Sequence, residues 1–230
     1  MNKIHTLTIT MPMGAINNTI YPVLLQDDKN LILVDCGFLG ALPLLEEAIY
    51  RQELQPADIT AIVLTHHDHD HMGALAPFKR KYPQVRILAS ALEEPYIAGK
   101  VKSLRLRQAE ERQAALPPEQ QAFGEGFMAM LRRVEPVAVD EIVSDGQQFD
   151  WCGGWQIIST PGHMPGHISL FLPELKTVIT GDAMSLSDGN PSIANPQYTM
   201  DMAQAEKDIE RLLSLDAKTF LCYHCGTCHL

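Results

Sequence analysis

The sequence lacks long hydrophobic runs and has few cysteines. No stretch of its 230 residues approaches the roughly 18 consecutive apolar residues of a membrane-spanning helix. The first ten residues alternate apolar and polar side chains as a strand does, and they lack the apolar core of a signal peptide. Five cysteines are an odd number for a disulfide framework. We therefore expect reduced thiols and a cytoplasmic protein.

Positive charge is also scarce. Lys and Arg number 18 against 28 Asp and Glu, which gives a formal net charge of -10. A field of this sign repels phosphate, so nucleic acid and anionic membranes are excluded as expected partners, and a small-molecule substrate remains. With 46% hydrophobic and 20% charged residues, the composition is that of a globular chain.

No internal repeat, low-complexity tract or linker divides the chain, so we expect one α/β domain over residues 1–230. Apolar, β-branched runs predict strands, and helical spacing of apolar residues predicts helices over 42–54 and 202–215. The predicted strands are 31–34, 62–64, 85–88, 155–158, 177–180 and 219–222. Residues 91–134 carry helical patterning around Pro117-Pro118. We interpret them as a helical insertion, and a plain helical crossover without a role in recognition is the alternative.

The most informative segment is Thr65–Gly73, which reads THHDHDHMG and directly follows a predicted strand. Six successive imidazoles and carboxylates would be costly to bury without partners, because each polar group loses its hydration. At the carboxyl end of a buried strand, where α/β enzymes place their ligands, this composition indicates metal binding. A solvated surface loop is the alternative.

Three weaker signals also follow predicted strands. Residues 159–167 read STPGHMPGH, and their two Pro-Gly turns would aim His163 at a fixed point. Gly181-Asp182 ends another strand, and Tyr223-His224 follows the last one. Each signal alone is weak, but four strand ends can converge on one edge of a sheet.

The four motifs together, preceded by the strand end at 33–37, resemble the metallo-β-lactamase superfamily over essentially the whole chain. The resemblance implies a four-layer αββα sandwich and a dinuclear metal-binding hydrolase. The implied first metal site consists of His66, Asp68 and His163, the second consists of Asp70, His71 and His224, and Asp182 bridges the two. His67 and His69 occupy variable positions of the motif. The resemblance also implies that His167 contacts a ligand or faces the substrate.

Asp68 departs from the family pattern, which usually has His at this position. A carboxylate adds hard oxygen ligation, which also suits Fe or Mn. We expect Zn as the metal, with Fe or Mn as the alternatives. Two ions about 3.5–4 Å apart would hold a bridging hydroxide, and Asp70 would act as the catalytic residue that orients it or takes its proton. His167, Ser185, Tyr198 or a metal-bound water would protonate the leaving group.

We therefore predict a metal-dependent hydrolase acting on a small thioester, lactone or ester. An iron-dependent oxidoreductase or dioxygenase of the same fold is the alternative, and a binding module with a degenerate site is a third. Near the C-terminus, Cys222, Cys225 and Cys228 have the spacing C-x2-C-x2-C, which is found in zinc and iron–sulfur sites. We favour unreactive thiols for these three residues.

Overall fold

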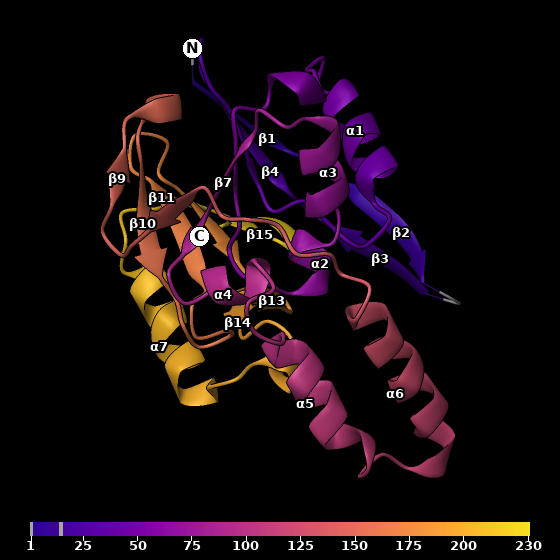
Figure 1. The fold of residues 1–230 in the computed structure, drawn as a ribbon. Coiled ribbons are helices and arrows are strands. Elements are labelled where there is room, and N and C mark those ends of the chain that lie inside the picture. Colours follow the sequence, from indigo (N-terminus) through magenta and orange to yellow (C-terminus); the bar gives the residue numbers. More distant parts are fainter. Residues whose placement is uncertain (1, 14–15) are drawn as a thin grey trace.

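Two six-stranded sheets pack face to face in the computed structural model, which describes residues 2–13 and 16–230 (Figure 1). The first sheet has the order β1 (Lys3–Thr6), β4 (Val23–Gln26), β5 (Leu31–Val34), β6 (Ala61–Val63), β7 (Arg86–Ser90) and β8 (Glu141–Val143). The second has the order β16 (Gly226–His229), β15 (Thr219–Cys222), β12 (Thr177–Gly181), β11 (Ile168–Leu172), β10 (Trp155–Ser159) and β9 (Gln148–Phe149).

Apolar side chains from both sheets fill the space between them. Val34 and Val63 of the first sheet belong to the same buried cluster as Ile157 and Leu170 of the second. Strands in the middle of such a sandwich are buried on both faces, so they consist of continuous apolar runs such as 31–34. This explains why the strand prediction from β-branched runs was confirmed for the central strands.

Helices cover the outer face of each sheet. On the first sheet lie α1 (Leu42–Tyr50) and α3 (Leu75–Lys81), whose Leu45 and Phe78 pack in one cluster with Leu33. On the second sheet lies α7 (Met202–Leu213), whose Leu212 packs with Phe220. The predicted αββα sandwich is therefore confirmed.

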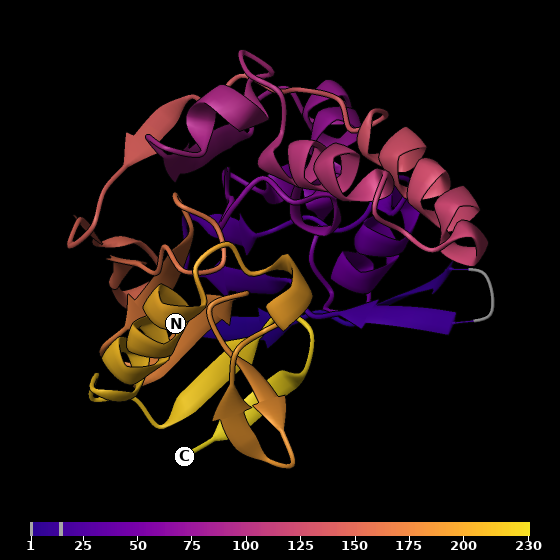
Figure 2. The same cartoon turned by 90° about the horizontal axis from the view of Figure 1, so that it is seen from below.

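The chain between β7 and β8 forms three helices: α4 (Glu94–Ile97), α5 (Leu104–Gln113) and α6 (Pro118–Leu131). Ser103 caps α5 by accepting a hydrogen bond from the backbone N–H of Leu106 at 3.4 Å. Leu106, Met128 and Leu131 hold α5 and α6 together. Both helices project from the sandwich, and hairpin β2–β3 (Ile9–Met13 and Ile16–Ile20) extends toward α6 (Figures 1 and 2).

The remaining elements are short. They are α2 (His69–Met72), hairpin β13–β14 (Ser185–Ser187 and Asn190–Ser192) and the 3-10 turns η1 (Pro56–Asp58), η2 (Trp151–Gly153) and η3 (Pro196–Tyr198). The predicted helix 42–54 ends earlier, at Tyr50, because the chain turns and Glu53 takes a positive φ of 60°. Within the described ranges, no helix is long and apolar enough to cross a bilayer.

Candidate metal centre

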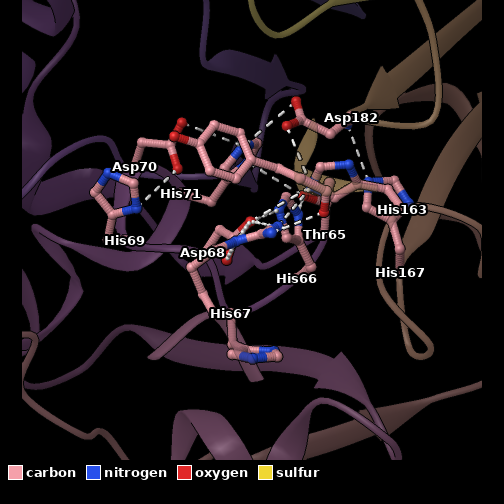
Figure 3. A network of polar contacts seen from close by, with 12 residues as sticks. Thr65, His66, His67, Asp68, His69, Asp70, His71, His163, His167 and Asp182 are labelled. Carbon is pink, nitrogen blue, oxygen red and sulfur yellow. Dashed lines mark hydrogen bonds and ion pairs between the residues drawn. The ribbon is translucent and has the colours of Figure 1, made fainter. Parts of the chain in front are cut away.

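Four connections that follow strands meet at one edge of the sandwich. Figure 3 shows residues from three of them, which follow β6, β10 and β12. They carry His66, Asp68, Asp70 and His71 after β6, His163 after β10, Asp182 after β12, and His224 after β15. Strands β10, β12 and β15 run in the same direction, so their carboxyl ends lie at the same edge of the second sheet. The structure thus brings together all seven side chains for which the resemblance implies metal binding.

The first trio consists of His66, Asp68 and His163, and all three residues are buried. Oδ2 of Asp68 lies 3.4 Å from Nε2 of His66 and 3.4 Å from Nε2 of His163. One carboxylate oxygen and two imidazole nitrogens therefore converge on one point.

The second trio consists of Asp70, His71 and His224. Oδ2 of Asp70 lies 4.0 Å from Nε2 of His71 and 3.3 Å from Nε2 of His224. Asp182 lies between the trios. Its Oδ1 is 3.5 Å from Nε2 of His71, and its Oδ2 is 3.5 Å from Nε2 of His163, so each trio faces one oxygen of the same carboxylate.

Several polar atoms in this cluster lack hydrogen bonds. Nε2 of His66, His71 and His224 and Oδ1 of Asp182 are buried and have no hydrogen-bond partner within the described part of the chain. Buried polar atoms are nearly always paired, because desolvating them without compensation is costly. Converging imidazole and carboxylate lone pairs are the donors that divalent transition metals accept, so the residues present fit such ions.

Asp35 orients two of these imidazoles. Its Oδ2 lies 2.8 Å from Nδ1 of His71, and Oδ2 also accepts a 2.8 Å hydrogen bond from the hydroxyl of Thr65. The Thr65 hydroxyl in turn lies 3.0 Å from Nδ1 of His66. A proton held on each Nδ1 leaves both Nε2 atoms with a free lone pair directed into the cluster. The sequence showed Asp35 only as part of a strand end, without a role.

The charge of the cluster favours a cation. Burial lowers the pKa of His71, but the carboxylates of Asp35, Asp182 and Asp70 outweigh it and raise that pKa well above its usual value. For His224, burial again lowers the pKa, but Asp182 and Asp70 raise it to about 10. Without another cation, the imidazoles of His71 and His224 therefore hold protons that compensate the surrounding carboxylates, whereas burial and the neighbouring His71 lower the pKa of His66.

A residue that sequence reasoning missed, Arg105 of α5, contacts the first trio. Its Nη2 donates a 2.6 Å hydrogen bond to Oδ2 of Asp68, and its Nε lies 3.1 Å from both oxygens of that carboxylate. Burial raises the pKa of Asp68, but the positive charge of Arg105, a hydrogen bond with His163 and the nearby imidazole of His66 hold it well below its usual value.

His167 supports the site through the backbone. Its Nε2 accepts a 3.0 Å hydrogen bond from the backbone N–H of Asp182, and its Nδ1 lies 2.8 Å from the hydroxyl of Thr160. A Cβ at Gly181, whose φ is +54°, would come within 2.6 Å of the same Nε2. With both ring nitrogens engaged, His167 fixes the Asp182 backbone.

The two remaining motif histidines lie in different surroundings. His67 is buried, hydrogen-bonds Glu93 through Nδ1, and accepts a 3.2 Å hydrogen bond at Nε2 from the backbone N–H of Leu104, where α5 begins. His69 packs edge-on against Phe127 with ring centroids 5.6 Å apart. His67 therefore ties the motif to the helical insertion, and His69 faces the cavity described next.

A cavity of about 590 Å³ opens over both trios. Its floor includes residues from both trios and Asp182, and its walls come from β3, α5, α6 and η3. The wall residues include Asn17, Asn18 and Thr19, the aromatic residues Phe38, Phe123, Phe127 and Tyr198, and also Arg105, Asn195 and Gln197. Of the three side chains proposed as proton donors beside a metal-bound water, Tyr198 lines this cavity, whereas His167 and Ser185 do not belong to the described residues that line it.

The three C-terminal cysteines are free thiols. Cys222 and Cys228 are buried, and Cys225 is partly buried. The His, Cys, Asp and Glu groups close enough to hold an ion, among residues 2–13 and 16–230, contain none of these cysteines.

A four-layer αββα sandwich with histidines and aspartates gathered at one edge is the architecture of the metallo-β-lactamase fold. The family model of the metallo-beta-lactamase superfamily matches residues 18–224, so the chain belongs to this superfamily. The resemblance carried by the four motifs is thereby confirmed.

Individual relatives are more distant. The chain is 27% identical over 187 residues to the probable metallo-hydrolase YflN of Bacillus subtilis, covering 79% of this chain and 64% of that protein. It is 28% identical over 140 residues to a hydroxyacylglutathione hydrolase of Photobacterium profundum, covering 60% of this chain and 47% of that enzyme. The chain thus spans less than two thirds of the length of either relative.

Solved structures agree on the fold. The crystal structure of a metallo-beta-lactamase family protein from Thermus thermophilus matches with a TM-score of 0.71 at 24% identity. The match covers 98% of this chain and 74% of that protein.

Proposed function

We propose that this protein is a dinuclear metal-dependent hydrolase that cleaves a small ester-like bond. The observation that carries the proposal is the pair of trios joined by Asp182, whose buried Nε2 and Oδ1 atoms lack hydrogen-bond partners in the described chain. Six candidate ligands divided around a seventh, the shared carboxylate of Asp182, suit two ions better than one. Zn²⁺ is the expected metal, and Mn²⁺ and Fe²⁺ are alternatives.

Two bound divalent ions would supply Lewis acidity at the scissile carbonyl and lower the pKa of an attacking water toward ~7. The side chains of this protein supply the rest. Asp70 lines the cavity, and we assign it the proton of the attacking water, since its Oδ2 faces His224 while its Oδ1 lies 3.5 Å from Nδ1 of His69. Asp182 links the two trios, because each of them faces one of its carboxylate oxygens.

We assign protonation of the leaving group to Tyr198. The Tyr198 ring lies on the cavity wall, 6.2 Å from the ring of Phe127 and 4.8 Å from the guanidinium of Arg105. His167, the other ionisable candidate, has both ring nitrogens engaged, and this supports Tyr198 as the donor.

The cavity favours an uncharged acyl group. Phe38, Phe123, Phe127 and Tyr198 offer apolar surface. Among the described lining residues, Arg105 is the one Lys or Arg, and its charge is already paired with Asp68. The hydroxyacylglutathione hydrolase relative supports the ester-like class of bond, including thioesters. The shortage of free positive charge argues against a substrate with several carboxylates.

The iron-dependent oxidoreductase alternative depended on the extra negative charge of Asp68. Because Arg105 contributes a positive charge in direct contact with that carboxylate, the first trio and Arg105 together carry no extra negative charge. The argument for a harder metal is therefore weakened, and we favour the hydrolase.

The test combines metal analysis with a substrate panel. Chelator-stripped protein is reconstituted with Zn²⁺, Mn²⁺ or Fe²⁺ and assayed with nitrophenyl esters of increasing acyl length, a lactone and a glutathione thioester, while dissolved oxygen is monitored. We expect metal-dependent hydrolysis without oxygen uptake. Asp70→Asn should lower kcat by about 100-fold or more, and the exposed Asp58→Asn should not. Turnover that consumes oxygen and requires iron would contradict the proposal.

A further inference from the structure

Arg105 is the feature of the site that the hydrolase proposal leaves without a role. It belongs to α5, whose other arginines, Arg107 and Arg112, are not buried, yet Arg105 itself is 2% exposed. All three nitrogens of its guanidinium donate hydrogen bonds. Nε and Nη2 bind Asp68, and Nη1 donates to Oε1 of Gln108 at 2.5 Å and to the backbone carbonyl of Tyr198 at 2.7 Å.

The position of the guanidinium matters because of the oxygen that it binds. Oδ2 of Asp68, which accepts from Nη2 of Arg105, is also the oxygen that faces Nε2 of His66 and His163. Nη2 itself lies 3.5 Å from Nε2 of His163. A guanidinium does not lose its proton in proteins, so a permanent positive charge adjoins the first trio.

The second trio has no counterpart to this charge. In the described chain, the ion-pair partners of Asp70 are His69, His71 and His224, all of them imidazoles that can become neutral. A cation at the second trio would meet a carboxylate that is not already bound to a permanent cation. A cation at the first trio would share its carboxylate oxygen with Arg105.

We propose that Arg105 makes the first trio the weaker of the two metal sites, so that the second trio loads first and α5 governs loading of the second ion. This inference rests on the proposed function, because it requires that both trios bind a metal ion. Arg105 acts as a positioning residue in this scheme. It fixes the Asp68 carboxylate and withdraws part of its charge from the metal.

The test measures metal affinity directly. Metal-stripped protein is titrated with Zn²⁺ in competition with a chromophoric chelator, for the wild type, Arg105→Met and the matched control Arg107→Met. We expect one tight and one weak ion in the wild type. Arg105→Met should raise the affinity of the weak site by about tenfold or more while the tight site is unchanged. Arg107→Met, on the exposed side of the same helix, should change neither.

A purely structural role for Arg105 predicts the opposite sign. If the guanidinium only kept Asp68 in place, Arg105→Met would release the carboxylate and weaken the site. A weak-site affinity that falls or stays unchanged in this variant therefore overturns the inference. A wild type that binds two ions but shows this result leaves the proposed function intact, whereas a wild type that binds no ion contradicts the proposed function itself.

A second pair of variants tests the inference independently of how Arg105→Met folds. Asp68→His leaves the buried guanidinium without its carboxylate, so we expect this variant to lose the weakly bound ion. The double variant Asp68→His/Arg105→Met replaces the charged pair with neutral side chains and should regain that ion. A double variant that binds the second ion no better than Asp68→His would overturn the inference.

Discussion

The two trios are built from the same residue types, one aspartate and two histidines, but their surroundings differ. The first trio adjoins the insertion helix α5, and its aspartate is bound to Arg105. The second trio lies against the sandwich, where His71 contacts Asp35 and stacks on Tyr223. One trio is thus neutralised by a permanent charge from an insertion, and the other by imidazoles that gain or lose protons. Two trios of the same residue types need not bind a cation with equal affinity, because the charged residues that contact each trio change its net charge.

The largest expected effect comes from removing the link between the trios. Asp182→Ala should lose at least one metal and lower kcat by about 1,000-fold or more, because no other carboxylate faces both trios among the described residues. Metal analysis and steady-state kinetics check this prediction, with circular dichroism as the control for folding. Full activity with two bound ions would show that the trios work without their link.

Removing the support behind the second trio should have the next largest effect. Asp35→Asn weakens the hydrogen bonds that orient His71 directly and His66 through Thr65, so we expect a loss of about 10- to 100-fold in affinity for the tighter ion. Chelator competition measures it, and the exposed Asp58→Asn is the matched control. Unchanged affinity would indicate that Asp35 only stabilises the fold.

The pH dependence of stability sharpens the comparison further. In the metal-stripped chain, burial lowers the pKa of His224 but Asp182 and Asp70 raise it to about 10, so the folded state holds this proton more tightly than the unfolded state. The stability that this proton contributes is present below pH 6.5 and is lost as pH rises toward 10. We therefore expect the free energy of unfolding to fall across this range, and less steeply in His224→Gln. Equal slopes from urea titrations would exclude this coupling.

The smallest expected effect concerns the cavity wall. Phe123 and Phe127 of α6 line the cavity, and Phe123 is 74% exposed. Phe123→Ala/Phe127→Ala should alter the relative kcat/KM among acyl lengths by about tenfold without changing metal content, because each methylene contributes only about 1–3 kcal/mol to discrimination. Leu92→Ala, an exposed leucine outside the cavity wall, is the control. Unchanged ratios across the panel would exclude α6 from substrate selection.

The strands and the four polar motifs could be predicted from local patterns, whereas the sandwich and the grouping of the seven polar residues came from the resemblance to the superfamily. Buried strands are continuous apolar runs, and several candidate ligands follow them closely, as His66 follows β6 and Asp182 follows β12. Helix ends were less predictable. The helix that begins at Leu42 stops at Tyr50, before the apolar pattern ends at Leu54.

Arg105 could not be predicted in this way. It lies 37 residues beyond Asp68 in the chain, in a helix where Arg105, Arg107 and Arg112 look equivalent. The packing of α5 against segment 65–73 decides which arginine is buried. The hydrogen bond between Leu104 and His67 helps to fix this packing. The role of Asp35 likewise depends on contacts with Thr65 and His71, which lie 30 and 36 residues further along the chain.

The most direct test of unequal trios is Zn²⁺ titration of two single-trio variants. His163→Ala removes a side chain from the first trio, and His224→Ala removes one from the second. We predict that the wild type binds two ions, that His163→Ala keeps one ion at the tight affinity, and that His224→Ala keeps one ion at the weak affinity. Equal affinities in the two variants, or a tighter ion remaining in His224→Ala, would contradict the account.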